Sequence, residues 1–159
     1  MIKFNTEHYD FMTFDPKRLD HLKAKMYLAT DLSIRKYLGD VTVFLEDTEE
    51  KGLMDSAFLV GRNDKIVGYL ALFDYYRHVD FHYAVIPSHR GFKYSLTETT
   101  GASIIREASD ELFKITPVID FIRLYIDKNN INSLRAAESA GFSYCESVLQ
   151  TDIYKKFRK

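Results

Sequence analysis

The chain has only one cysteine, Cys145, and its 159 residues include no tryptophan. A single cysteine cannot form an intramolecular disulfide bond and cannot build a cysteine-based zinc site. No apolar run approaches the roughly 18 residues that a membrane span needs, and the first residues lack the apolar core of a signal peptide. We therefore expect a metal-free cytoplasmic protein that binds no membrane, with Cys145 as a buried strand residue and not a nucleophile.

The chain also lacks an excess of either charge. Its 22 lysine and arginine residues stand against 23 aspartate and glutamate residues, which gives a net charge of −1. A protein that binds nucleic acid by neutralising phosphates usually carries a basic excess, so that class is excluded. Hydrophobic residues make up 46% of the chain, which is enough for a folded core and excludes disorder for most of it. The length fits one domain over residues 1–159.

The N-terminal third is expected to be mostly helical. Residues 9–14 form a first expected strand, after which Asp15 would be a helix N-cap and Pro16 the first helical residue. Asp31 is placed to cap a second, short helix. Helical spacing predicts that the first helix packs on the core through an apolar stripe of Leu19, Leu22, Met26 and Ala29.

From residue 56 onward, strand and helix patterns alternate. Helices are expected after residue 95 and over 130–140. The strand near residue 80 would turn Asp80 and His82 to the same face, so an acid and a histidine lie side by side. The order predicts an α/β sandwich around a mixed sheet. The expected strands in this region cover residues 56–60, 65–73, 79–86, 118–126, 143–149 and 153–157.

The segment after Ile86 is a candidate phosphate site. Ser95 and Glu98 have the spacing of a capping box, so the loop would turn directly into a helix N-terminus. Such an N-terminus offers backbone N–H groups and the positive end of the helix dipole to a pyrophosphate, and Arg90 and Lys93 add positive charge. A loop before a capped helix is also an ordinary structural feature, so this segment alone leaves both interpretations open.

A second segment is more specific. Asn130, Ser133, Gly141 and Phe142 follow at a fixed spacing, and helix capping explains each residue but not their joint occurrence. On these two segments the sequence resembles the GNAT superfamily of acyl-CoA-dependent N-acetyltransferases, over about residues 56–157. It looks most like the branch of ribosomal-protein N-terminal alanine and serine acetyltransferases. The resemblance implies a GNAT-like α/β fold, with a mixed, mostly antiparallel sheet of about seven strands and helices on both faces.

The resemblance also implies acetyl-CoA as co-substrate and assigns residues to it. Pantetheine would extend a sheet edge at residues 83–85, and the pyrophosphate would sit on the loop that follows. Arg90 and Gly91 match the family's loop pattern, whereas Lys93 and Ser95 replace its usual small residues. The implied cofactor-binding residues are Tyr83, Ala84, Val85, Arg90, Gly91, Phe92, Lys93, Tyr94, Ser95, Leu96, Asn130 and Ser133.

Direct attack of an amine on the thioester needs a base for the amine, a donor to the oxyanion and a proton for the leaving thiolate. The backbone N–H near Val85 is the best candidate for the oxyanion. Asp80 and His82 are the candidate bases, since His82 with an ordinary pKa of about 6.5 accepts a proton at neutral pH. A base that acts through a water molecule stays equally open.

For the thiolate, the family's frequent tyrosine would fall at Ala137, so that donor is missing. The branch named above commonly carries a serine instead, which points to Ser133. Asp152 stands where that branch tends to carry a carboxylate, and Tyr144 is a further donor candidate. The predicted catalytic residues are therefore Ser133, His82, Asp80 and Asp152.

We expect an N-acetyltransferase that modifies a primary amine, on a small molecule or a protein N-terminus, as a monomer or homodimer. No motif identifies the amine. Two other classes stay open. One is a non-catalytic acyl-CoA-binding or sensing domain, which Lys93, Ser95 and Ala137 would favour and any turnover would exclude. The other is an interaction module, which would bind no acyl-CoA at all.

Overall fold

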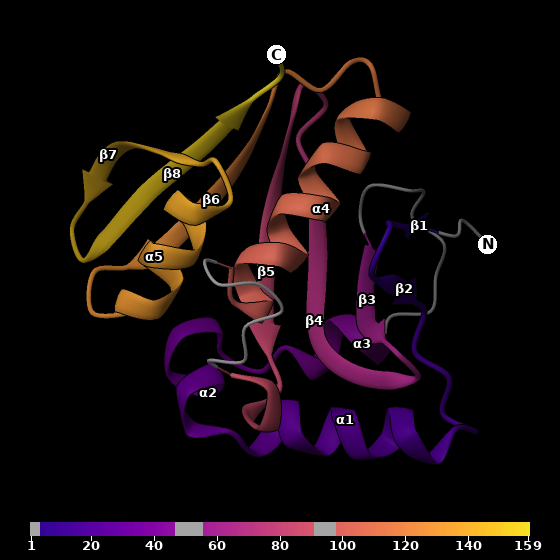
Figure 1. The fold of residues 1–159 in the computed structure, drawn as a ribbon. Helices are drawn as coiled ribbons and strands as arrows, with labels where there is room; N and C mark the ends of the chain where they lie inside the picture. Colours follow the sequence, from indigo (N-terminus) through magenta and orange to yellow (C-terminus); the bar gives the residue numbers. More distant parts are fainter. Residues whose placement is uncertain (1–3, 47–55, 91–97) are drawn as a thin grey trace.

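The computed structural model describes residues 4–46, 56–90 and 98–159, which form an eight-stranded sheet with the order β1-β2-β3-β4-β5-β6-β8-β7 (Figure 1). The helices are α1 (Leu19–Thr30), α2 (Leu32–Leu38), α3 (Thr42–Glu46), the 3₁₀ helix η1 (Pro87–His89), α4 (Thr100–Ile115) and α5 (Ile131–Ser139). The strands are β1 (Phe4–Asn5), β2 (Asp10–Met12), β3 (Ser56–Arg62), β4 (Lys65–Asp74), β5 (His78–Val85), β6 (Phe121–Asp127), β7 (Ser143–Val148) and β8 (Thr151–Phe157).

Helices cover both faces of the sheet. Helices α4 and α5 pack against one face, where Ile104 and Phe142 share a core with Phe81. Helices α1, α2 and α3 cover the other face, where Leu28 and Ile34 are buried in a second core. The predicted fold class is therefore confirmed, with the two-residue β1 as an additional strand. Within the described ranges, no helix is long and apolar enough to cross a membrane.

Strand β5 contributes to both cores because its side chains alternate. Val79 and Phe81 point to the core under α4, whereas Ala84 and, just after the strand, Ile86 point to the core under α1 and α2. The predicted division of this strand into two faces is confirmed. The expected strands from residue 56 onward are all present, with ends that differ by a few residues.

Of the strand pairs that the structure describes, only β5 and β6 run parallel. Their register covers three pairs, from His78 opposite Phe121 to Asp80 opposite Arg123. Beyond this point β5 keeps pairing with β4, and β6 keeps pairing with β8, to their C-terminal ends. The two central strands therefore separate, and the facing edges of their second halves have no strand partner among the described residues.

The predicted start and the predicted buried face of the first helix are wrong. Helix α1 begins at Leu19, because the Asp15 carboxylate accepts the N–H of Lys17 and closes a turn before the helix. The helix packs through His21, Ala24 and Leu28. His21 sets this face, since its Nδ1 accepts the Asp15 N–H at 3.0 Å and its ring stacks on Phe14. Of the predicted stripe, Leu19, Leu22 and Met26 are exposed.

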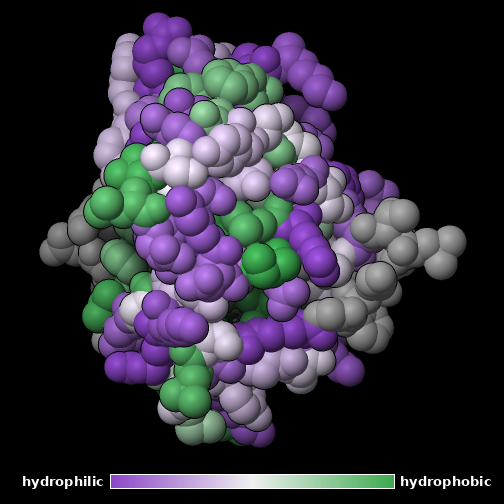
Figure 2. Space-filling model, turned by 90° about the vertical axis from the view of Figure 1, so that its left-hand side faces the viewer, coloured by the Kyte–Doolittle hydropathy of each residue, from purple (hydrophilic) through white to green (hydrophobic). Residues whose placement is uncertain are grey.

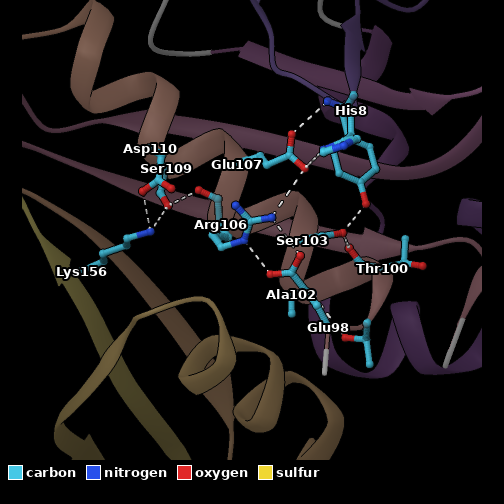
Figure 3. A network of polar contacts seen from close by, with 12 residues as sticks. His8, Glu98, Thr100, Ala102, Ser103, Arg106, Glu107, Ser109, Asp110 and Lys156 are labelled. Atoms are coloured by element: carbon cyan, nitrogen blue, oxygen red, sulfur yellow. Dashed lines mark hydrogen bonds and ion pairs between the residues drawn. The ribbon is translucent and has the colours of Figure 1, made fainter. Parts of the chain in front are cut away.

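The predicted capping box is also wrong in the role it gives Glu98. Thr99 is the N-cap of α4, and its hydroxyl accepts the N–H of Ala102 at 3.4 Å. Glu98 instead binds Arg106, with Nε–Oε2 and Nη2–Oε1 distances of 2.5 and 2.9 Å (Figure 3). An ion pair with a residue two turns into α4 therefore takes the carboxylate that the local pattern assigned to the helix start. Ser95 lies outside the described residues.

Cys145 is exposed, which contradicts its prediction as a buried residue. It lies in β7, an edge strand whose residues are all exposed, at the point where the pairing with β8 shifts register between Tyr144 and Glu146. The residues around Cys145 do not reveal that its strand is at the edge, because the neighbour of a strand is decided by the order of the whole sheet.

Substitution of Gly68 by alanine is expected to destabilise the fold by about 1–3 kcal/mol, because the new methyl group would lie 2.7 Å from the Ala84 carbonyl oxygen and 3.2 Å from Ile104 Cδ1. The matched control is Gly61→Ala, whose methyl group would meet the flexible end of Met12 at 2.8 Å. Chemical denaturation of both variants measures the difference. A larger loss for Gly61→Ala would show that the β5 backbone yields more readily than the Met12 side chain.

Candidate acetyl-transfer site

A cavity of about 690 Å³ lies where β5 and β6 separate. Its walls are residues 81–85 of β5, residues 124–127 of β6, the exposed face of α5, part of α2 and Gly101 in the first turn of α4. Figure 2 faces this side of the molecule and shows a hollow with hydrophobic surface, framed by hydrophilic side chains. The fold therefore provides an apolar slot with polar edges along an unpaired length of β5.

The backbone of β5 presents hydrogen-bonding groups to this slot. The Ile86 N–H donates to the Val67 carbonyl oxygen at 2.9 Å, so the peptide groups of Ala84 and His82 also face β4. By the same alternation, those of Tyr83 and Val85 face away from β4, toward the cavity. Pantetheine was predicted to bind the main chain of Tyr83, Ala84 and Val85. The peptide N–H and C=O groups of Tyr83 and Val85 are on the cavity side, whereas those of Ala84 are not.

Arg90 connects the start of α2 with the end of β5 through hydrogen bonds. Its guanidinium forms two hydrogen bonds with the Asp31 carboxylate, at 2.8 and 3.1 Å, and its Nε donates to the Val85 carbonyl oxygen at 3.1 Å. Asp31 also caps α2 by accepting the Ile34 N–H, as predicted. The Arg90 hydrogen bond is the main cause of a lowered Asp31 pKa. Arg90 lines the cavity; Gly91, Phe92, Lys93, Tyr94, Ser95 and Leu96 lie outside the described residues.

Helix α5 begins and ends as its sequence predicts. The Asn130 side chain accepts the Ser133 N–H at 3.4 Å, and Asn130 and Ser133 both line the cavity. Gly141 adopts a φ of +91°, and the following Phe142 donates its N–H to Ala137 and is buried. Ala137 is completely buried, and its neighbour Ala136 lines the cavity, so neither position supplies a proton donor.

His82 lines the cavity, and one of its ring nitrogens has no hydrogen-bond partner among the described residues. Its ring packs against Phe73 at a centroid distance of 4.7 Å. The buried Nδ1 has no hydrogen-bond partner within the described part of the chain. Burial lowers the pKa of His82, and the neighbouring Asp80 opposes that change only in part. His82 is therefore a neutral imidazole at pH 7.

Asp80 lies next to His82, but its carboxylate forms an ion pair with Arg123. Its two carboxylate oxygens accept hydrogen bonds from Arg123 Nε and Nη2 at 2.8 and 3.0 Å, and His78 Nε2 lies 3.8 Å from Oδ1. The carboxylate is almost completely buried and is not among the cavity walls. This ion pair leaves Asp80 poorly placed to take a proton from a substrate.

Asp152 and Tyr144 lie on the hairpin of β7 and β8, away from the cavity walls. Ser147 connects them, because its hydroxyl donates to Asp152 Oδ1 at 2.6 Å and lies 2.8 Å from the Tyr144 hydroxyl. Asp152 and Ser147 are cross-strand partners, which directs these side chains to each other. The structure thus brings His82 and Ser133 to one cavity but does not bring Asp152 to it.

Two features of the site were not predicted. Gly101 lies in the first turn of α4, where an added methyl group would be 3.2 Å from the Tyr83 ring. A glycine inside an otherwise strong helical pattern is a signal of such close packing. Helix α2 contributes Tyr37 and Leu38 to the cavity wall, and no local pattern distinguishes these residues from ordinary core residues.

No protein-family model matches the sequence, and no curated protein matches it. Solved structures match its fold. A GNAT-family acetyltransferase from Bacillus anthracis is 15% identical over 98% of each chain, with a TM-score of 0.73. The N-acetyltransferase PseH from Campylobacter jejuni, solved with acetyl coenzyme A, is 12% identical over 95% of this chain and 99% of that one, with a TM-score of 0.67. Aminoglycoside acetyltransferase AAC(6')-Ib, solved with coenzyme A, is 18% identical over 95% of this chain and 94% of that one, with a TM-score of 0.65.

These likenesses extend over almost the whole chain at low sequence identity, so they establish architecture and not activity. The comparisons give the ribosomal-protein branch no support. The separated β5 and β6, the cavity between them and the solved neighbours agree on one architecture. The chain has the fold of the GNAT acetyltransferases.

Proposed function

We propose that this chain is an acetyl-CoA-dependent N-acetyltransferase that modifies a primary amine. The observation that carries the proposal is the unpaired edge of β5, whose Tyr83 and Val85 peptide groups border a cavity also lined by Asn130 and Ser133. An extended pantetheine chain carries amide groups that such an edge can bind as an added strand. The apolar slot suits the rest of that chain, and solved neighbours of this fold contain acetyl-CoA or CoA.

Within this proposal His82 acts as the general base. An amine enters from the cavity, His82 or a water molecule bound to it takes a proton from the nitrogen, and the nitrogen forms a bond to the thioester carbonyl carbon. The Val85 N–H is the candidate donor to the developing oxyanion, because the Val85 peptide group faces the cavity. The C–S bond then breaks, and its electron pair goes to the sulfur, near which Ser133 is the candidate donor.

The amine itself is not specified by the cavity. The aminoglycoside acetyltransferase with this fold was also solved with kanamycin. The first panel of candidate amine substrates should therefore include amino sugars beside N-terminal peptides and polyamines. A second function, acyl-CoA binding without turnover, is favoured by Ala136 and Ala137, since neither of these α5 positions carries a proton donor. Acetylation of any amine in the panel excludes this second function.

Acetyl-CoA is expected to stabilise the chain against thermal unfolding. A ligand at about 100 times its dissociation constant contributes roughly 2.7 kcal/mol. For a chain of this length that raises the midpoint by about 5–10 °C. Differential scanning fluorimetry with acetyl-CoA, and with desulfo-CoA as a control for the nucleotide and pantetheine parts, measures this shift. No shift with either ligand at millimolar concentration would exclude both the transferase and the binding function.

A further inference from the structure

Tyr83 has a buried hydroxyl group beside the cavity. Its ring lines the cavity and packs against Gly101, where an added methyl group would be only 3.2 Å from the ring. The hydroxyl is shielded from solvent and has no hydrogen-bond partner among the described residues. A buried hydroxyl without a partner costs about 1–3 kcal/mol of stability, which favours a role that is completed by a partner or ligand.

The polar side chain next to this hydroxyl is Ser133, on the first turn of α5. Burial raises the pKa of Tyr83 to about 12, and the Ser133 hydroxyl opposes part of that rise. The two groups are therefore close, although they do not meet the geometry of a hydrogen bond. Hydrogen bonds in active sites are often long in a ligand-free enzyme and shorten when substrate binds. Ser133 is half-buried, and it lines the same cavity as Tyr83.

We infer that Tyr83 is a positioning residue, whose hydroxyl donates a hydrogen bond to Ser133 Oγ and so directs the Ser133 hydrogen toward the sulfur of a bound thioester. This inference rests on the proposed acetyl transfer. A serine hydroxyl that accepts one hydrogen bond becomes a better donor in another, because hydrogen bonds in a chain polarise one another. Tyr83 on β5 thereby strengthens Ser133 as a donor to the sulfur, on a helix whose Ala136 and Ala137 supply no donor.

The Tyr83 and Ser133 hydroxyls both keep their protons throughout the reaction, and the protons and electron pairs balance without them. The amine nitrogen forms the new C–N bond and loses one proton to His82 or to water. The C–S bond breaks with its electron pair on sulfur, and the Ser133 hydroxyl donates a hydrogen bond to the thiolate. The thiolate then gains a proton from solvent, so one proton in total moves from nitrogen to sulfur. The high pKa of Tyr83 keeps its hydroxyl a donor at every working pH.

The test uses the thiol of bound CoA and needs no knowledge of the amine. The ultraviolet absorbance of the thiolate is titrated with pH for CoA bound to the wild-type chain, Tyr83→Phe, Ser133→Ala and the double variant, with desulfo-CoA as the blank. A hydrogen bond to the thiolate lowers the thiol pKa. We expect the pKa of bound CoA to be about one unit lower in the wild-type chain than in Tyr83→Phe. In the Ser133→Ala background, the Tyr83→Phe change should have no further effect.

Tyr69→Phe is the matched control. Tyr69 also has a buried hydroxyl without a partner within the described ranges, but it lies in β4 in the opposite core and does not line the cavity. It should leave the pKa of bound CoA unchanged. Both phenylalanine variants should fold, because each loses only an unpaired hydroxyl.

The outcomes separate the inference from the proposed function. If CoA binds but Tyr83→Phe leaves its thiol pKa unchanged, the inference is wrong and the transferase proposal stands. An equal effect of Tyr83→Phe with and without Ser133 also overturns it, because Tyr83 would then act independently of Ser133. If neither CoA nor acetyl-CoA binds the wild-type chain, both fail together.

Discussion

Replacing His82 by glutamine is expected to lower kcat for amine acetylation by about 10²-fold, the lower end of what general-base catalysis contributes. Glutamine keeps the size and polarity of the side chain but cannot take up the proton. The KM for acetyl-CoA should change little, since the strand edge that we propose for pantetheine is unaffected. Steady-state kinetics with a saturating amine from the panel measures both constants.

The pH dependence gives an independent test of the same residue. Burial lowers the pKa of His82, so the imidazole stays unprotonated, and the wild-type rate should persist, to a pH below about 6.5. The rate should fall as the pH drops through the lowered pKa, because the base is then protonated. Asp80 raises this pKa in part, so Asp80→Asn should move the acidic limb to lower pH.

Two controls test whether the loss of rate comes from His82 itself: a second histidine variant and a check that the protein stays folded. His89 also has a pKa lowered mainly by burial, but it is not among the cavity walls, so His89→Gln should retain wild-type kcat. Burial also lowers the pKa of His21 and His78. Protonation of these buried histidines favours the unfolded chain, so stability is lost as the pH falls below about 6.5, and circular dichroism must show a folded protein at each pH. Equal loss of kcat in both glutamine variants would remove His82 from the mechanism.

Asp80→Asn is expected to destabilise the fold by about 3 kcal/mol, at the low end of the cost of breaking a buried ion pair. Asp80 is almost fully buried and holds Arg123 through two hydrogen bonds, so the substitution leaves a guanidinium without its counter-charge. The cost stays at the low end because one fifth of the Arg123 side chain is exposed. A thermal melt should show a midpoint about 6–12 °C lower.

The chain provides a matched control for this variant. Arg77 and Asp120 form the same two-bond pair, at 2.7 and 3.1 Å, between the loop before β5 and the residue before β6, but both side chains are about half exposed or more. Exposed pairs contribute little because water solvates both partners, so Asp120→Asn should have little effect on the melt. Equal destabilisation by the two substitutions would show that burial is not what makes the Asp80 pair important.

The sequence alone predicts those parts of the protein that depend on neighbouring residues. The two faces of β5, the Asp31 cap of α2 and the start and end of α5 at Asn130 and Gly141 follow from alternation and capping within a few residues. The fold class follows from the order of these elements, and the residues that resemble the GNAT family belong to the same local patterns. These predictions succeed because their interactions span one strand or one helical turn.

The tertiary structure decides which side chains meet, even where the partners are only five to eight positions apart. His21 turns α1 to a face that its apolar spacing does not indicate, Arg106 takes Glu98 from its predicted cap, and the register of the β7–β8 hairpin directs Asp152 to Ser147. Arg123, 43 positions along the chain from Asp80, occupies the carboxylate that local alternation places beside His82. Which charges pair, which helix face is buried and which hydroxyl lies beside a cavity depend on how the elements pack in three dimensions. Local propensity carries no information about such contacts, so only the packed sheet separates His82, which keeps a free nitrogen, from Asp80, which does not.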